Sequence, residues 1–324
     1  KKETIMPWLL DRLFDHQNQP TPQFAFQGTV NWMRALAILV DSASFESLSL
    51  SQFYRNVQRR QPNLDADTLA FECLLMALHN VASLNEFQRT EDKYSVVRPA
   101  IIAWYYSLYY SSKSMLAAVS GSNPDTHAMA GRLWQSDTVD RNLIIPPFSY
   151  SISDLTPNNI SNCVELLRGT NPHNLNQAPV TEEQAYGAVI SYLKGTAEYE
   201  KWRAEEKVKS TSQFRQLNVV NFRTRAAQEV RDLALARCHV NILVQAFRYR
   251  GKANYRDAIY LSYGLDFSET LTTFVSDMAT VAKAYAFMVS HYLPRRVERG
   301  VWGRFGEDLA VNSRFDLPFD LRRI

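Results

Sequence analysis

The chain has 324 residues, a formal net charge of +3, 46% hydrophobic residues and 21% charged residues. This composition fits a globular protein of one large or two ordinary domains, and it excludes a disordered chain and a mini-protein. Glycine accounts for only 11 residues, about half of the usual roughly 7%, which disfavours turn-rich β folds and favours helices.

Apolar residues recur at intervals of three and four through most of the chain, which is the period of an amphipathic helix. We therefore predict an all-α fold of antiparallel helical bundles. In chain order, the expected helices cover residues 5–16, 30–40, 50–60, 65–88, 99–119, 160–167, 181–209, 222–249 and 268–292.

Local signals support several of these helix ends. Asp65 or Asp67 can cap the helix over 65–88, and Pro99 is tolerated in the first turn of the next helix, which Gly121 stops. The sequence from Thr181 to Gln184 has the pattern of a capping box. Pro294 is expected to close the helix over 268–292.

A connection rich in proline and asparagine over residues 136–180 is the best place to divide the chain. We expect an N-terminal helical lobe over 1–135, a C-terminal helical lobe over 181–293 and an arginine- and aromatic-rich arm over 294–324. Connections of this length are often functional or ordered by a partner.

The chain has no membrane-spanning signal, because no run approaches the roughly 18 uninterrupted apolar residues that a span needs. The charged start, Lys1 to Glu3, leads to Met6-Pro7-Trp8 and not to an apolar signal core. The cysteines are odd in number and widely spaced, as is typical of reduced thiols: Cys73, Cys163 and Cys238. We expect a cytoplasmic protein that does not contact a membrane.

Motifs for several common chemistries are missing. The sequence has neither a Cys-x-x-Cys pair nor a His-Glu-x-x-His motif, and the adjacent Cys238 and His239 would point to different faces of a helix. It also has no glycine-rich phosphate loop and no nucleophile elbow. We therefore expect no metal and no cofactor.

Charge is unevenly distributed along the chain. Residues 207–256 hold eleven basic and two acidic residues, so the remainder is net negative. Such a segment can bind RNA or an acidic protein surface, or it can be a solvated face balanced by acids elsewhere in the fold. The residues we expect to form the basic binding surface are Arg223, Arg225, Arg231, Arg237, Arg248, Arg250, Lys252 and Arg256. Interleaved Phe247 and Tyr249 add stacking partners, which suit a single strand or a protein interface.

The most specific pattern lies between residues 100 and 134. Tyr105-Tyr106 is followed one turn later by Tyr109-Tyr110, then by Lys113 among small residues, and Thr126-His127 opens the next helix. This segment, over 96–135, resembles HEPN domains, which are all-α bundles of prokaryotic toxins and defence proteins. A second phrase, from Lys252 to Gly264, is similar to the Tyr-Arg-Asp-Ala helix of some HEPN proteins but stands in the wrong order; a second degenerate copy and chance both explain it.

The resemblance implies metal-independent RNA cleavage by an arginine followed about four to six residues later by a histidine, in a homodimer or a hetero-complex. The matching pair in this sequence is Arg168 and His173. Gly169 and Pro172 make that stretch a poor helix, and Ala103 stands where some family members carry an arginine. These departures favour a catalytically degenerate member.

Two functional hypotheses of different classes follow. The first is a HEPN-like component of a prokaryotic defence or RNA-processing system that binds RNA through the basic residues with Tyr105 and Tyr106. The second is a non-enzymatic adaptor subunit of a larger assembly. The tyrosines and histidines also have structural interpretations. The tyrosines can be core residues whose hydroxyls reach the rim, His127 can be a helix-start residue bonded to a cap, and His239 can be a buried residue.

Overall fold

A computed structural model of the chain describes residues 8, 9, 12, 22–169, 175–254, 259, 261–264 and 266–324. Over these residues the fold is all-α, as predicted. Its β structure is a single isolated bridge between Ile152 and Val240. The longer helices are α2 (Pro22–Val40), α4 (Leu64–Arg89), α5 (Lys93–Ser120), α7 (Pro157–Arg168), α8 (Glu182–Lys209), α10 (Arg225–Leu235), α11 (Ile242–Asn254), α12 (Ser268–Arg296) and α13 (Val301–Asn312). The shorter ones are η1 (Ala43–Phe45), α3 (Ser47–Phe53), α6 (His127–Trp134), a π-turn η2 (Gln135–Val139), α9 (Ser212–Arg215) and η4 (Leu321–Arg323).

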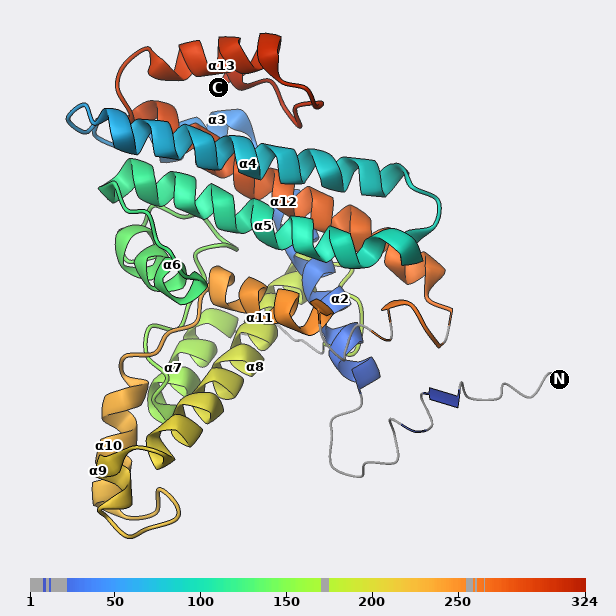
Figure 1. Ribbon diagram of the computed structural model, residues 1–324. Helices are drawn as coiled ribbons and strands as arrows, with labels where there is room; N and C mark the ends of the chain where they lie inside the picture. The colour runs from blue at the N-terminus through green and yellow to red at the C-terminus, as the bar shows by residue number, and fades with distance from the viewer. Residues whose placement is uncertain are drawn as a thin grey trace, which may run out of the picture.

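Three long helices form the main bundle. Helices α4, α5 and α12 pack side by side, with α13 lying beyond them next to the C-terminus (Figure 1). Helix α2 packs on α12 and on the start of α8, while α6 and α11 cover part of α5. Because α12 follows the 136–180 connection and α4 precedes it, the largest core draws on residues from both sides of that connection.

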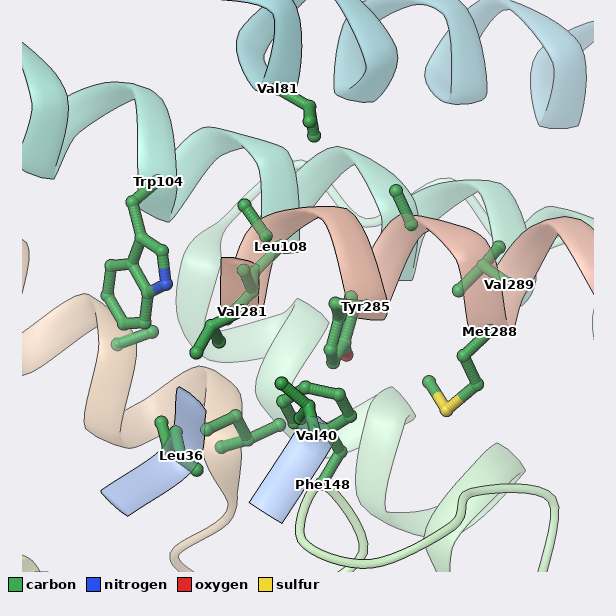
Figure 2. Close-up of a cluster of buried hydrophobic side chains, with 14 of the residues drawn as sticks. Leu36, Val40, Val81, Trp104, Leu108, Phe148, Val281, Tyr285, Met288 and Val289 are labelled. Atoms are coloured by element: carbon green, nitrogen blue, oxygen red, sulfur yellow. The ribbon is translucent and has the colours of Figure 1, made fainter. Parts of the chain in front are cut away.

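Side chains from several helices meet in this core. Figure 2 shows them pointing toward one another from α2, α5 and α12, with Phe148 arriving from the connection. Tyr285 is fully buried among them, and its ring packs edge-on against Phe148 with centroids 4.7 Å apart. The Tyr285 hydroxyl lies 2.7 Å from the Ser112 hydroxyl, so its polar atom is satisfied inside the core.

A second, smaller core supports a projecting arm. We define the arm as α7, the second half of α8, α9 and α10, which extend away from the three-helix bundle (Figure 1). Its apolar contacts come from Ile160 and Val164 of α7, from Leu193 and Ala197 of α8, and from Leu235 of α10. Near its tip, Val208, Phe214 and Ala227 form a third cluster.

Capping residues explain most helix starts. The Asn63 side chain accepts a hydrogen bond from the Ala66 amide at 3.1 Å and caps α4, in place of the expected Asp65 or Asp67. Thr181 caps α8 as predicted, and the Gln184 side chain accepts from the Val180 amide at 2.9 Å, one residue before the expected partner.

Helix α5 begins earlier than expected, because Asp92 caps it at Lys93 and leaves Pro99 inside. It ends as predicted at Gly121, whose φ of 73° is a left-handed conformation that glycine adopts without strain. The expected end of the helix over 268–292 at Pro294 was wrong, because Pro294 lies inside the helix. Helix α12 runs on to Arg296, whose guanidinium donates to the Gln58 and Val119 carbonyls at 2.8 and 3.0 Å.

The single helix predicted over 222–249 was also wrong, because the chain breaks between α10 and α11. At the break, Val240 pairs with Ile152, with N–H···O distances of 2.8 and 2.9 Å. Asn241 then starts α11: its carbonyl oxygen accepts from the Leu243 and Val244 amides. Its amide nitrogen donates to the Gly131 carbonyl at 2.9 Å and to the Gln135 side chain at 3.2 Å. Pairing and capping outweigh the helical periodicity here.

Other expectations concern single segments. The helix expected over 30–40 is the second half of α2, and the one over 160–167 lies within α7. The helix expected over 50–60 was wrong beyond Phe53, where α3 ends. The helix expected over 5–16 lies almost entirely outside the described residues. Among the helices that the structure describes, none combines the length and apolar character needed to cross a bilayer.

We expect Asn241→Ala to lower the free energy of unfolding by about 2 to 4 kcal/mol, because it removes a helix cap and leaves the buried side-chain oxygen of Gln135 without its donor. Urea unfolding followed by circular dichroism measures this. Asn63→Ala is the matched control, since it removes an exposed cap alone and should lower stability by about 1 kcal/mol. Equal losses in the two variants would contradict the role given to Asn241.

Candidate functional site

One edge of α5 is left open by its neighbours. Between Ala100 and Val119, the residues that are not buried are Ile102, Tyr106, Tyr110 and Lys113. Their spacing of four, four and three places them along one line on the helix surface. The two members of each tyrosine pair therefore have different environments: Tyr105 and Tyr109 belong to the core, and Tyr106 and Tyr110 reach the surface.

The start of α6 packs against α5 beside this edge, through a contact between a core tyrosine and a histidine. Tyr105 is 1% exposed, and its hydroxyl lies 2.5 Å from Nδ1 of His127. His127 is the first residue of α6, directly after Thr126, whose side chain caps the helix by accepting from the Met129 amide at 3.2 Å. His127 is thus a helix-start residue, but its partner is Tyr105 and not the cap.

Helix α11 adds an aromatic ring and a cation. The Phe247 ring stacks on His127 with centroids 4.8 Å apart and planes at 28°. One turn later, the Arg250 guanidinium carbon lies 5.3 Å from the centroid of Tyr106 and 5.5 Å from that of Tyr105. We call these residues the tyrosine–histidine cluster: Tyr105, Tyr106, Tyr109, Tyr110, His127, Phe247 and Arg250.

Burial sets the protonation states in the cluster. Desolvation raises the pKa of Tyr105 well above its usual range, so its hydroxyl is protonated at neutral pH. Desolvation also lowers the pKa of His127, and the positive charge of Arg250 lowers it further. A neutral imidazole therefore faces a protonated phenol. If the Tyr105 hydroxyl donates to Nδ1, Nε2 carries the proton and is a donor; with the opposite polarity, Nε2 is a base.

The predicted basic residues lie in two places. On α10, Arg225 pairs with Glu229 at 3.0 Å and Arg231 with Asp232 at 2.8 Å. Arg223 precedes α10 and Arg237 follows it, and both side chains are exposed. Arg248 and Arg250 lie instead on α11, beneath α5 (Figure 1). Lys252 is in the last turn of α11, and its side chain and Arg256 lie outside the described residues.

Arg248 and Arg250 face different neighbours although they are two residues apart. The Arg248 guanidinium carbon lies 4.0 Å from the centroid of Tyr199 on α8, away from the tyrosine–histidine cluster. Between them, Tyr249 is 4% exposed and packs edge-on against Trp104 and Trp32. The interleaved aromatic residues thus have separate roles, because Phe247 is 41% exposed and Tyr249 is core.

Of the candidate cleavage pair, Arg168 is the last residue of α7, and His173 lies outside the described residues. Of the second phrase, from Lys252 to Gly264, residues 255–258 and 260 also lie outside them. The cleavage hypothesis and the second HEPN-like phrase therefore stay predictions.

The cysteines are free thiols, and burial raises the pKa of Cys73 to about 11. His239 is half-buried, and desolvation lowers its pKa. Among the described residues, no group of three or more histidine, cysteine or acidic side chains is placed to hold a metal ion.

A serine–histidine pair was missed by sequence reasoning. Ser47 Oγ lies 2.9 Å from Nε2 of His291, whose Nδ1 lies 3.0 Å from the Phe287 carbonyl. The two residues are 244 positions apart, so no local motif could indicate the contact. Both ring nitrogens of His291 thus lie within hydrogen-bond distance of protein atoms, and we interpret the pair as a structural contact that holds α3 against α12.

Compared with protein-family models, curated proteins and solved structures, the chain shows no match. The resemblance to HEPN domains therefore rests on the residues of the 96–135 segment alone.

We expect His127 to titrate below its usual pKa of 6.5, and Arg250→Gln to raise that pKa, because the substitution removes a positive charge and admits water. Histidine-resolved NMR titration measures both values. Arg248→Gln is the matched control, since Arg248 faces α8, and it should leave the His127 pKa unchanged.

The lowered pKa of His127 also makes the stability of the fold depend on pH. The stability that neutral His127 contributes is present above pH 6.5 and is lost as the pH falls through the lowered folded-state pKa. A His127 pKa at or above 6.5 in the wild type, or one that does not rise in Arg250→Gln, would contradict the assigned environment.

Proposed function

We propose that the chain binds single-stranded RNA at the tyrosine–histidine cluster, as a HEPN-like component of a prokaryotic defence or RNA-processing system. The observation that carries the proposal is the placement of Arg250 on the faces of Tyr105 and Tyr106, next to the exposed Phe247 ring. A cation held on aromatic faces beside an exposed ring is a combination that proteins use for unpaired nucleotides.

Charge supports an anionic ligand. Among the described residues, no carboxylate lies within 4.0 Å of Arg250, whereas Arg225 and Arg231 of α10 are each paired with an acid. The Nε atom of Arg250 is buried and makes no hydrogen bond to the described part of the chain. The charge of Arg250 is therefore left for a partner, and a phosphate is one of the anions that a guanidinium binds through two parallel hydrogen bonds.

Aromatic exposure supports a single strand. The bases of a duplex are stacked on each other, so only unpaired bases are free to stack on protein rings. Phe247 offers a 41% exposed side chain, and the half-buried Tyr106 and Tyr110 extend the aromatic edge along α5. The tyrosine hydroxyls and the outer nitrogen of His127 are polar groups able to hydrogen-bond the 2′-hydroxyl that distinguishes RNA from DNA.

We expect Phe247→Ala to weaken binding of a fluorescein-labelled single-stranded RNA roughly 5- to 100-fold, which corresponds to about 1 to 3 kcal/mol for one lost stacking contact. Fluorescence anisotropy measures the affinity. Phe53→Ala is the matched control, because Phe53 is 42% exposed but lies on α3, outside the cluster. Equal affinity of wild type and Phe247→Ala would overturn the proposed site.

We expect affinity to fall with salt, and Arg250→Gln to reduce the slope of log affinity against log salt by about 0.7, the loss of one phosphate contact to a single strand. Arg304→Gln, an exposed arginine on α13, should leave the slope unchanged. Binding confined to low salt and equal for every polyanion would instead support the adaptor function.

RNA cleavage is a separate prediction that binding does not require. Incubating wild type and His173→Ala with transfer RNA in the absence of metal, followed by denaturing gels, tests it. Cleavage that is lost in the variant would assign the reaction to the predicted pair of Arg168 and His173. Intact RNA with the wild type would fit the degenerate motif, in which Gly169 interrupts the helix with a φ of 56°.

A further inference from the structure

A second group of exposed aromatic side chains lies on the arm, outside the tyrosine–histidine cluster. On α8, Trp202 is 54% exposed and Tyr199 is 38% exposed, and their ring centroids are 5.9 Å apart with planes at 37°. An indole of this size left open to water is unfavourable, because aromatic side chains bury most of their surface when they pack.

The rings on α8 are joined by an arginine from α11. The Arg248 guanidinium carbon sits 4.0 Å from the centroid of Tyr199, and its Nη1 atom lies 3.4 Å from the Gly195 carbonyl and from the Thr196 hydroxyl. The Nε atom of Arg248 is buried and has no hydrogen-bond partner within the described ranges. This repeats the arrangement at Arg250, where a guanidinium also rests on tyrosine rings.

The local charge balance leaves Arg248 uncompensated. Three acidic side chains of α8 are paired with bases of the same helix, in the ion pairs Glu198–Lys201, Glu200–Arg203 and Glu206–Lys209. Arg248 itself has no carboxylate within 4.0 Å among the residues that the structure describes. Its charge is therefore free to attract an anion beside the exposed rings.

Helix α11 connects the group on α8 to the proposed site, because it carries one arginine of each. Arg248 and Arg250 are two residues apart, so they leave the helix about 200° apart, on opposite sides of a cylinder about 10 to 12 Å wide. A short oligonucleotide reaches one side of α11, whereas a longer strand can pass over the helix and contact both sides.

We propose that Tyr199, Trp202 and Arg248 form a second stacking subsite for the same RNA strand, with a base on Trp202 and a phosphate on Arg248. The inference rests on the proposed function, because it places a longer single strand across α11. The subsite extends the bound length and is not needed by a short RNA.

The test compares two labelled oligouridines, of about 4 and about 12 nucleotides, by fluorescence anisotropy. We expect Trp202→Ala to weaken binding of the longer RNA roughly 5- to 100-fold and to leave the affinity for the shorter RNA unchanged. Trp8→Ala is the matched control: Trp8 is 66% exposed and also carries an arginine on its ring, and neither affinity should change. Arg248→Gln should reproduce the length-dependent loss.

The outcomes separate this inference from the proposed function. If Phe247→Ala weakens binding of both RNAs and Trp202→Ala weakens binding of neither, the second subsite is overturned and the proposed function stands. If neither variant has an effect, both are overturned. A Trp202→Ala loss that is equal for the two lengths would overturn the division into two subsites. Loss of polyglutamate binding with unchanged RNA affinity would assign the surface to an acidic protein partner and overturn the inference.

Discussion

The arrangement of the whole molecule depends on the burial of α5. Eighteen of its 28 residues are buried, because α4 and α12 pack along it and α6 and α11 cover further parts. A helix enclosed in this way needs small side chains, and the alanines and serines of its second half supply them. Two of these serines satisfy their hydroxyls on main-chain carbonyls: Ser112 donates to the Leu108 carbonyl at 2.8 Å, and Ser114 donates across to the Ala70 carbonyl of α4 at 2.7 Å. What stays open is one line of side chains, and the candidate site forms along it.

The helical content could be predicted from the sequence because it depends on local chemistry. The apolar period located α4 and α8, and Thr181 and Gly121 marked real helix boundaries. The errors arose where a distant contact outweighed the local pattern. The apolar period continues through Val240, but that residue is held by Ile152, 88 positions earlier, and Asn241 restarts the helix. Pro294 looks like a stop, yet carbonyl contacts made by Arg296 hold the last turn in place. Neither partner can be identified from the neighbouring sequence.

The candidate site was predictable in part for the same reason. Tyr105, Tyr106 and His127 stood out because they share one segment of sequence, and the structure joins Tyr105 to His127 by a hydrogen bond. The arrival of Phe247 and Arg250, more than a hundred residues later, depends on the packing of α11 on α5 and α6. The basic segment was visible as a composition, but its division into acid-paired arginines on α10 and ring-supported arginines on α11 follows from which helix each one faces.

Helix α8 belongs to both parts of the fold, and this has a mechanical consequence. Near its start, Tyr192 stacks on Trp32 of α2 with centroids 4.1 Å apart and planes at 6°, inside the main body. Ten residues later the same helix carries Trp202, about 15 Å further along its axis at 1.5 Å per residue. Because no turn or loop interrupts α8 between them, the arm cannot swing freely about this point. The distance between the two ends of this segment of α8 is therefore fixed, and a ligand that contacts both ends must span that distance.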